Sequence, residues 1–203
     1  MKNLTLAIDF DGVIADSDIA KLKFAREELG LDVSEEQIKY HYFLELFGKE
    51  KGHQLYQHII RTIYHSERML SVPMTAYAVE GISNLTATGW MCVVVTSRNG
   101  SPYEKGTSAY WAWKLMNVNG IEINKKDFIN VDEKSKLDAC LAQNAHGLVD
   151  DDYSKLAPVI EGGMKGYLFS TKTNRYAEQE FQPFLGTRVS DWKHLVKLLG
   201  EIS

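Results

Sequence analysis

Two aspartates one residue apart, Asp9 and Asp11, follow a short apolar run near the start of the chain and precede a glycine. The apolar run, from Leu4 to Ile8, has the composition of a buried parallel strand. Two carboxylates at this place would destabilise a hydrophobic core, because an unpaired buried charge is costly. Ligands of open α/β sheets bind at the carboxyl ends of strands, so we predict that this pair belongs to a site.

Two later apolar runs also end in polar side chains. The polar residues that follow them are Thr96, Ser97 and Arg98 in one case, and Asp150, Asp151 and Asp152 in the other. Strands that alternate with helices form a parallel sheet, and the carboxyl ends of its strands share one edge. A lysine, Lys136 or Lys134, lies at the start of the helix before the acidic run and can face the same edge.

These side chains together predict a site for a phosphate group. Clustered carboxylates repel one another unless a cation joins them, and hard oxygen ligands suit Mg²⁺. A magnesium ion, an ammonium group and a hydroxyl together can neutralise and hold phosphate charge.

The segment from 18 to 75 differs from the rest, because its apolar residues recur at helical spacing and no strand pattern interrupts them. We therefore expect a Rossmann-like α/β core made of residues 1–17 and 76–203, with a helical cap over residues 18–75. The strands expected in the core are 4–8, 90–95, 128–131, 147–149 and 166–169. The helices expected in the core are 78–88, 105–117, 136–144, 153–161 and 191–199.

Composition narrows the class of protein. The chain has 203 residues and a formal net charge of -4, which argues against a nucleic-acid polymer as partner. No apolar run approaches the roughly 20 residues of a membrane span, and we expect no signal peptide. Cys92 and Cys140 belong to an apolar strand and a helix, and we expect them to be buried free thiols, which suits a reducing, cytoplasmic setting. The oligomeric state is left open.

The order Asp-x-Asp-Gly, Thr-Ser, Lys and Asp-Asp resembles that of the haloacid dehalogenase-like (HAD) superfamily. Within it, the chain resembles the phosphatase branch that includes the 5'(3')-deoxyribonucleotidases, along its whole length and including the helical insert. This resemblance implies a HAD-type phosphatase that hydrolyses a small phosphorylated metabolite with Mg²⁺. A (deoxy)nucleoside monophosphate is the first candidate substrate.

The resemblance also implies a role for each site residue. Asp9 would be the nucleophile that forms an aspartyl-phosphate, and Asp11 the general acid and base. The residues that bind the phosphate would be Thr96, Ser97 and Lys136. The metal ion would be bound by Asp9, by the backbone carbonyl of Asp11 and by Asp151. Asp150 and Arg98 would lie beside these ligands.

Some assignments stay open at this point. Lys136 is preferred to Lys134 because it begins the helix, and Asp151 is preferred to its neighbours as the second polar residue after the strand. Arg98 is either a loop residue or a grip on a second anionic or polar group of the substrate. Two other functions are compatible with these residues: phosphoryl transfer to an acceptor other than water, and non-catalytic binding of a phosphorylated ligand.

Overall fold

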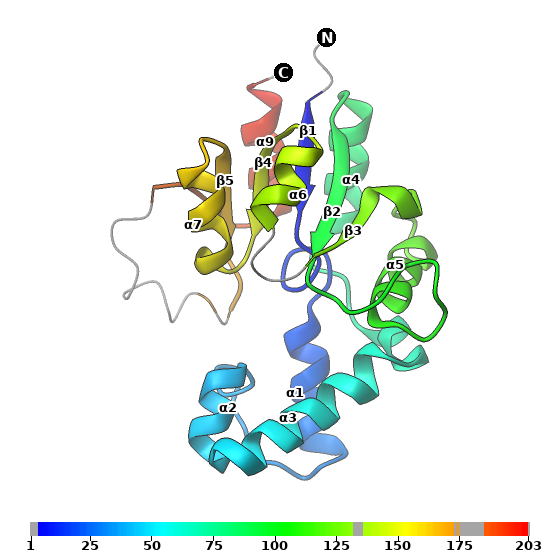
Figure 1. The fold of residues 1–203 in the computed structure, drawn as a ribbon, viewed down its shortest axis with the longest axis vertical. Helices are drawn as coiled ribbons and strands as arrows, with labels where there is room; N and C mark the ends of the chain where they lie inside the picture. Colours follow the sequence, from blue (N-terminus) through cyan, green and yellow to red (C-terminus); the bar gives the residue numbers. More distant parts are fainter. Residues whose placement is uncertain (1–3, 132–135, 173, 175–184, 203) are drawn as a thin grey trace.

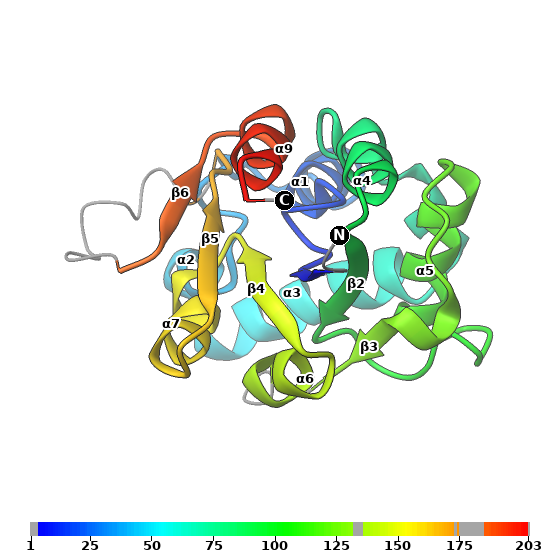
Figure 2. The ribbon, with the colours of Figure 1, turned by 90° about the horizontal axis from the view of Figure 1, so that it is seen from above.

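The computed structural model describes residues 4–131, 136–172, 174 and 185–202. Six parallel strands form one sheet in the order β3-β2-β1-β4-β5-β6 (Figure 2). The strands are β1 (Thr5–Ile8), β2 (Met91–Thr96), β3 (Phe128–Asn130), β4 (Ala145–Asp150), β5 (Lys165–Phe169) and β6 (Thr187–Val189). The α/β architecture predicted from the sequence is confirmed.

Helices follow most strands. The α-helices are α1 (Ser17–Glu27), α2 (Tyr40–Phe47), α3 (Lys49–Tyr64), α4 (Ala78–Ala87), α5 (Ser108–Val118), α6 (Lys136–Ala142), α7 (Tyr153–Glu161) and α9 (Trp192–Gly200), and two short 3-10 helices are η1 (Glu67–Ser71) and η2 (Lys125–Asp127). All five expected core helices are present within a few residues of their predicted bounds. The strand β6 was not predicted, because three residues are too few to show an alternating pattern.

Strand β1 is the centre of the sheet. Its residue Ile8 pairs with Val94 of β2 on one side and with Val149 of β4 on the other. The whole strand is buried, as its apolar composition requires. Because all strands are parallel, the residues that follow β1, β2 and β4 come out at the same edge of the sheet.

Helices cover both faces of the sheet, and each face has its own hydrophobic cluster. Helices α4, α5 and α9 lie on one face, and α6 and α7 on the other (Figure 2). The larger cluster continues from the sheet into the segment after β1, where it includes Phe43 and Ile59. That segment is therefore packed onto the core rather than hanging from it.

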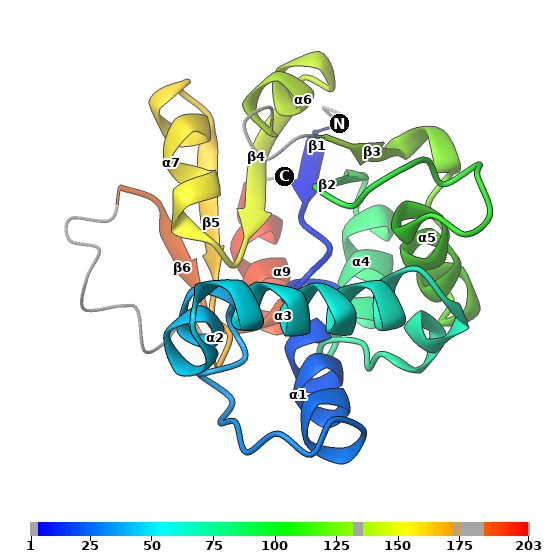
Figure 3. The same cartoon turned by 60° about the horizontal axis from the view of Figure 1, so that its bottom comes forward.

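The segment between β1 and α4 contains helices and no strand among its residues, all of which the structure describes. These helices lie beyond the carboxyl ends of the strands, and α3 runs across them (Figure 1, Figure 3). The chain leaves and re-enters the core side by side, since Asp16 N donates to Pro73 O at 2.8 Å and Thr75 N to Ile14 O at 2.9 Å. The division into a core and a cap at residues 18–75 stays a prediction.

Among the described residues, none of the helices combines the length and the apolar character that a membrane crossing needs.

Trp192, at the start of α9, connects the last helix to the loop after β1. Its side chain is fully buried, and its indole Nε1 donates a hydrogen bond to Val13 O at 2.8 Å. Its ring lies 6.0 Å from the ring of Phe169 between centroids.

We predict that Trp192→Ala lowers the free energy of unfolding by about 3–5 kcal/mol, because it leaves a cavity and an unsatisfied carbonyl. Urea unfolding followed by circular dichroism measures the change. The control is Lys197→Ala on the exposed side of the same helix, which we expect to shift stability by no more than about 0.5 kcal/mol. Equal losses in the two variants would contradict the role given to Trp192.

Candidate active site

Asp9 lies directly after β1 and is almost fully buried, with 7% of its surface exposed. Its backbone N–H donates to Val149 O at 2.8 Å, so it continues the pairing of β1 with β4. Its Oδ1 is 2.8 Å from Nζ of Lys136. Burial raises the pKa of Asp9 above its ordinary value, although the charge of Lys136 opposes this shift.

Lys136, the first residue of α6, lies between two of the predicted carboxylates. Its ammonium is 2.8 Å from Asp9 Oδ1 and 2.6 Å from Asp150 Oδ2, and only 5% of its surface is exposed. Burial alone would lower the pKa of Lys136, but the two carboxylates raise it above its ordinary value, so it stays charged. The alternative, Lys134, lies outside the described residues.

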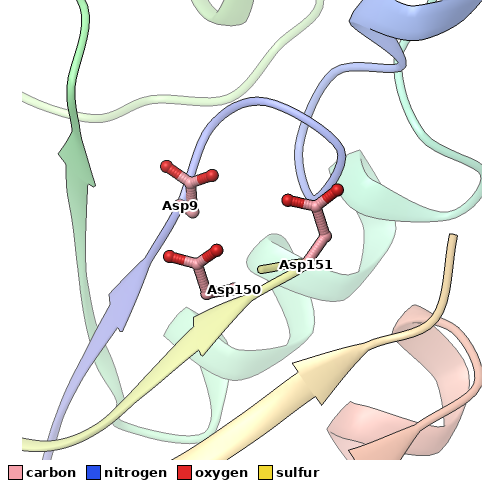
Figure 4. A group of neighbouring side chains, drawn as sticks. All are labelled: Asp9, Asp150 and Asp151. Carbon is pink, nitrogen blue, oxygen red and sulfur yellow. The ribbon is translucent and has the colours of Figure 1, made fainter. Parts of the chain in front are cut away.

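Three aspartates form the acidic cluster that the sequence predicts. One carboxylate oxygen from each of Asp9, Asp150 and Asp151 lies within 4.8 Å of the other two (Figure 4). Burial raises the pKa of Asp150 to about 8 and that of Asp151 to about 7, and neighbouring aspartates add to both shifts. The cluster is therefore short of positive charge, and its hard oxygen donors fit a divalent cation such as Mg²⁺.

The third aspartate of the acidic run has a different role. Asp152 is the N-cap of α7, where its Oδ1 accepts a hydrogen bond from Ser154 N at 2.8 Å. A carboxylate in this position stabilises the first turn of the helix. Among the three candidates in this run, Asp150 and Asp151 are thus the two that join Asp9.

Two residues outside the predicted site residues set the position of Asp151: Gly12 of the Asp-x-Asp-Gly motif and Asn174, which had no predicted role. Gly12 has a φ of 79°, and a Cβ added to it would overlap the Asp151 carboxylate. Asn174 donates from Nδ2 to the backbone carbonyl of Asp151 at 2.9 Å and to that of Phe169 at 2.6 Å. A lone asparagine in a loop carries no sequence signal for such a role.

The side chain of Asp11 lies apart from the acidic cluster and binds Arg98. The guanidinium donates from Nη2 to Oδ1 at 2.7 Å and from Nε to Oδ2 at 3.0 Å, and Ser17 Oγ also donates to Oδ1. Burial by itself would raise the pKa of Asp11, but Arg98, Ser17 and Lys21 lower it below its ordinary value. Asp11 is therefore held as a carboxylate.

Arg98 is itself held by the segment after β1. Its guanidinium carbon lies 3.8 Å from the ring centroid of Tyr64 in α3 and 4.7 Å from that of Phe10, and its Nη1 is 3.4 Å from the sulfur of Met69. Arg98 is only 4% exposed. This residue therefore joins Asp11 to the helices that cover the sheet edge, a contact that no spacing in the sequence indicates.

A cavity of about 430 Å³ contains the predicted site residues. Its lining includes every one of them: Asp9, Asp11, Thr96, Ser97, Arg98, Lys136, Asp150 and Asp151. Thr96 is buried and Ser97 is exposed. A second hollow, of about 220 Å³ beside α1, holds neither Asp9 nor Lys136.

Charged residues from the segment after β1 form one wall of this cavity. Lys39 Nζ lies 2.8 Å from Asp18 Oδ2 and 3.5 Å from Asp151 Oδ2. Lys21 Nζ pairs with Asp18 Oδ1 and lies 3.4 Å from the hydroxyl of Tyr56. In the sequence these lysines look like the solvated side of helical segments, so they were not predicted to belong to the site.

No family model and no curated protein matches the chain in sequence. Solved structures match its fold. A haloacid dehalogenase-like family hydrolase from Streptococcus pneumoniae is 12% identical, with a TM-score of 0.66 and all of each chain covered. A HAD family hydrolase from Deinococcus radiodurans, with bound phosphate and sodium, is 13% identical, with a TM-score of 0.65, 98% of this chain covered and 95% of that one.

A D,D-heptose 1,7-bisphosphate phosphatase from B. bronchiseptica, complexed with magnesium and phosphate, is 13% identical, with a TM-score of 0.61 and coverage of 98% and 99% of the two chains. At these identities the likeness is one of fold. The chain has the fold of the HAD hydrolases, as its motif order predicted. The resemblance to the nucleotidase branch stays a prediction.

We predict that the acidic cluster binds Mg²⁺ and that Gly12→Ala weakens this binding by about tenfold or more, because the added methyl group would displace the Asp151 carboxylate. Isothermal calorimetry with MgCl₂ measures the affinity. Gly30→Ala is the matched control: Gly30 also has a positive φ, of 63°, but a Cβ there meets no atom within 4 Å. This control should lose stability only, and unchanged Mg²⁺ affinity in Gly12→Ala would refute the role of Gly12.

Proposed function

We propose that this chain is a Mg²⁺-dependent phosphatase that hydrolyses a small phosphomonoester through an aspartyl-phosphate on Asp9. The observation that carries the proposal is the position of Lys136, whose ammonium joins Asp9 to Asp150 within a cluster of three carboxylates. A buried carboxylate beside a fixed cation, at the carboxyl edge of a parallel sheet, is suited to phosphoryl transfer.

The acidic cluster would hold the metal ion. Asp9 and Asp151 would supply carboxylate oxygens, the backbone carbonyl of Asp11 would supply a third oxygen, and Asp150 would lie beside them. When bound, Mg²⁺ supplies positive charge that neutralises the phosphate and orients it. Among the described residues, two ammonium groups, those of Lys136 and Lys39, contact the three carboxylates, and this shortage of positive charge supports the assignment.

Asp9 would attack the phosphorus atom, and the ester oxygen would leave. Lys136 neutralises Asp9 and would neutralise the oxygens of the transferring group as charge accumulates on them. Thr96 is the last residue of β2 at the same sheet edge, and Ser97 lies next to it. Their hydroxyl and amide groups would donate hydrogen bonds to those oxygens. These assignments agree with the roles that the resemblance implies.

Asp11 would move the protons. It would protonate the departing ester oxygen and then take a proton from the water that hydrolyses the aspartyl-phosphate. Arg98 and Ser17 favour its ionised form, which is the form needed for the second of these steps. For the first step Asp11 would have to take up a proton from solvent, and it would return to the carboxylate when that proton passes to the ester oxygen. Arg98 would thus position Asp11, which is neither of the two roles left open by the sequence, a loop residue or a grip on the substrate.

The helical segment 18–75 would act as a cap that closes the cavity and selects the substrate. A cavity of about 430 Å³ suits a small metabolite. A (deoxy)nucleoside monophosphate is the substrate that the nucleotidase resemblance favours. A nucleic-acid polymer is not expected as partner, and a cytoplasmic location stays a prediction.

Two alternatives make different predictions. A phosphotransferase would place the phosphoryl group on an organic acceptor, whereas a phosphatase incorporates oxygen from ¹⁸O-labelled water into the released phosphate. A non-catalytic binding protein would bind phosphorylated ligands without turning them over.

We predict that Asp9→Asn lowers the turnover of p-nitrophenyl phosphate by about a thousandfold or more, because the amide cannot act as the nucleophile. Steady-state release of nitrophenol measures the change, and circular dichroism checks the fold. Asp138→Asn, at an exposed position in the first turn of α6, is the control and should keep wild-type activity. Undiminished turnover by Asp9→Asn would exclude the aspartyl-phosphate mechanism.

We also predict that a chelator abolishes the activity and that added Mg²⁺ restores it, because the acidic cluster needs a cation to accept a phosphate group. The assay is hydrolysis of the same aryl phosphate in excess EDTA, before and after dialysis into MgCl₂. Full activity in excess chelator would show that the acidic cluster works without a metal ion.

A further inference from the structure

The wall of the cavity formed by the helical segment carries more positive than negative charge. Lys21 and Lys39 both pair with one carboxylate, that of Asp18, and all three residues line the cavity that contains Asp9. Lys21 is 6% exposed, so its charge is turned inward rather than into solvent.

Lys39 also contacts Asp151, which would bind the metal ion. Asp151 lies 3.5 Å from the Lys39 ammonium, and under the proposed function its carboxylate binds the metal ion. With Asp151 engaged by the metal, Asp18 is, among the described residues, the one carboxylate that remains in ion-pair contact with the two ammonium groups. A cation in a confined cavity is costly unless an anion compensates it, so this wall is suited to a negatively charged group of the ligand.

The aromatic side chains on the same wall have partners of their own. The ring of Tyr64 lies against the Arg98 guanidinium, 3.8 Å from centroid to carbon. The ring of Tyr56 packs edge-on against Tyr40 and Phe43, with centroids 5.1 and 5.7 Å away. These contacts use the rings for packing. The side chains that also line the cavity on this wall are Gln57, Ile60 and His65, and the cations that it presents are the two ammonium groups.

We propose that Lys21 and Lys39 form a subsite for a second anionic group of the substrate, a carboxylate or a further phosphate on the leaving group. The inference rests on the proposed phosphatase function and names its substrate class: small phosphomonoesters that carry an additional negative charge. Asp18 holds the two ammonium groups side by side and sets their spacing.

The test compares two substrates that differ in one group. In 3-phosphoglycerate a carboxylate occupies the place of the hydroxymethyl group of glycerol 3-phosphate, so the ratio of their kcat/KM values reports the subsite. We expect the wild-type enzyme with Mg²⁺ to favour 3-phosphoglycerate by about tenfold or more. Thymidine 5'-monophosphate is measured beside them as the nucleotide alternative.

Substitutions then test whether Lys21 and Lys39 cause the preference for 3-phosphoglycerate. Lys21→Met and Lys39→Met should each reduce the ratio toward one, by raising KM for 3-phosphoglycerate more than KM for glycerol 3-phosphate. Because Lys21 acts on Asp11 and Lys39 contacts Asp151, any change in kcat should affect both substrates alike and cancel in the ratio. Lys21→Arg keeps the charge and should keep the ratio, which separates loss of charge from loss of packing at this buried position. Lys23→Met is the matched control on the same helix, because its side chain is exposed, and it should leave the ratio unchanged.

The outcomes separate this inference from the proposed function. If the wild type hydrolyses p-nitrophenyl phosphate but does not distinguish the two glycerol derivatives, or if both methionine variants keep the preference, the subsite is refuted and the phosphatase stands. A preference for thymidine 5'-monophosphate that survives both substitutions also refutes it. If the wild type hydrolyses no phosphoester, the proposed function fails, and calorimetric binding of 3-phosphoglycerate to the same variants decides on the subsite alone.

Discussion

Repulsion among buried carboxylates is the constraint on which the structure depends. Asp9, Asp150 and Asp151 are brought together at one edge of the sheet because their strands are parallel neighbours, and burial makes their charges costly. Cations from other parts of the chain offset this cost: Lys136 reaches the cluster from α6, and Lys39 reaches it from the segment after β1. The three carboxylates contact two ammonium groups from distant parts of the chain, and a bound metal ion would supply further positive charge.

The two aspartates after β1 have different surroundings, and their pKa values are shifted in opposite directions. Asp9 meets a lysine and two carboxylates, and its pKa is raised. Asp11 meets a bidentate arginine and a serine hydroxyl, and its pKa is lowered. Two identical side chains one residue apart thereby have different charge environments. Under the proposed function, Lys136 and a bound cation would favour the ionised form of Asp9 that acts as the nucleophile.

The helical segment after β1 contributes to the site as well as covering it. Tyr64 stacks on Arg98, the residue that holds Asp11, and Lys39 contacts Asp151. A movement of these helices would alter the surroundings of both aspartates at once. Substrate selection and the positioning of the catalytic groups would therefore be linked through the same contacts in the proposed enzyme.

The sequence by itself determined the fold class and the edge of the sheet where the site lies. Apolar runs that alternate with helical patterns require a parallel sheet, and polar residues at the ends of three runs must then meet, so Asp9, Thr96 and Asp150 could be brought together without coordinates. Only the tertiary structure decided which partner each carboxylate has. The pairing of Asp11 with Arg98 and of Asp151 with Lys39 depends on packing between distant segments, where side-chain geometry acts and local periodicity carries no information.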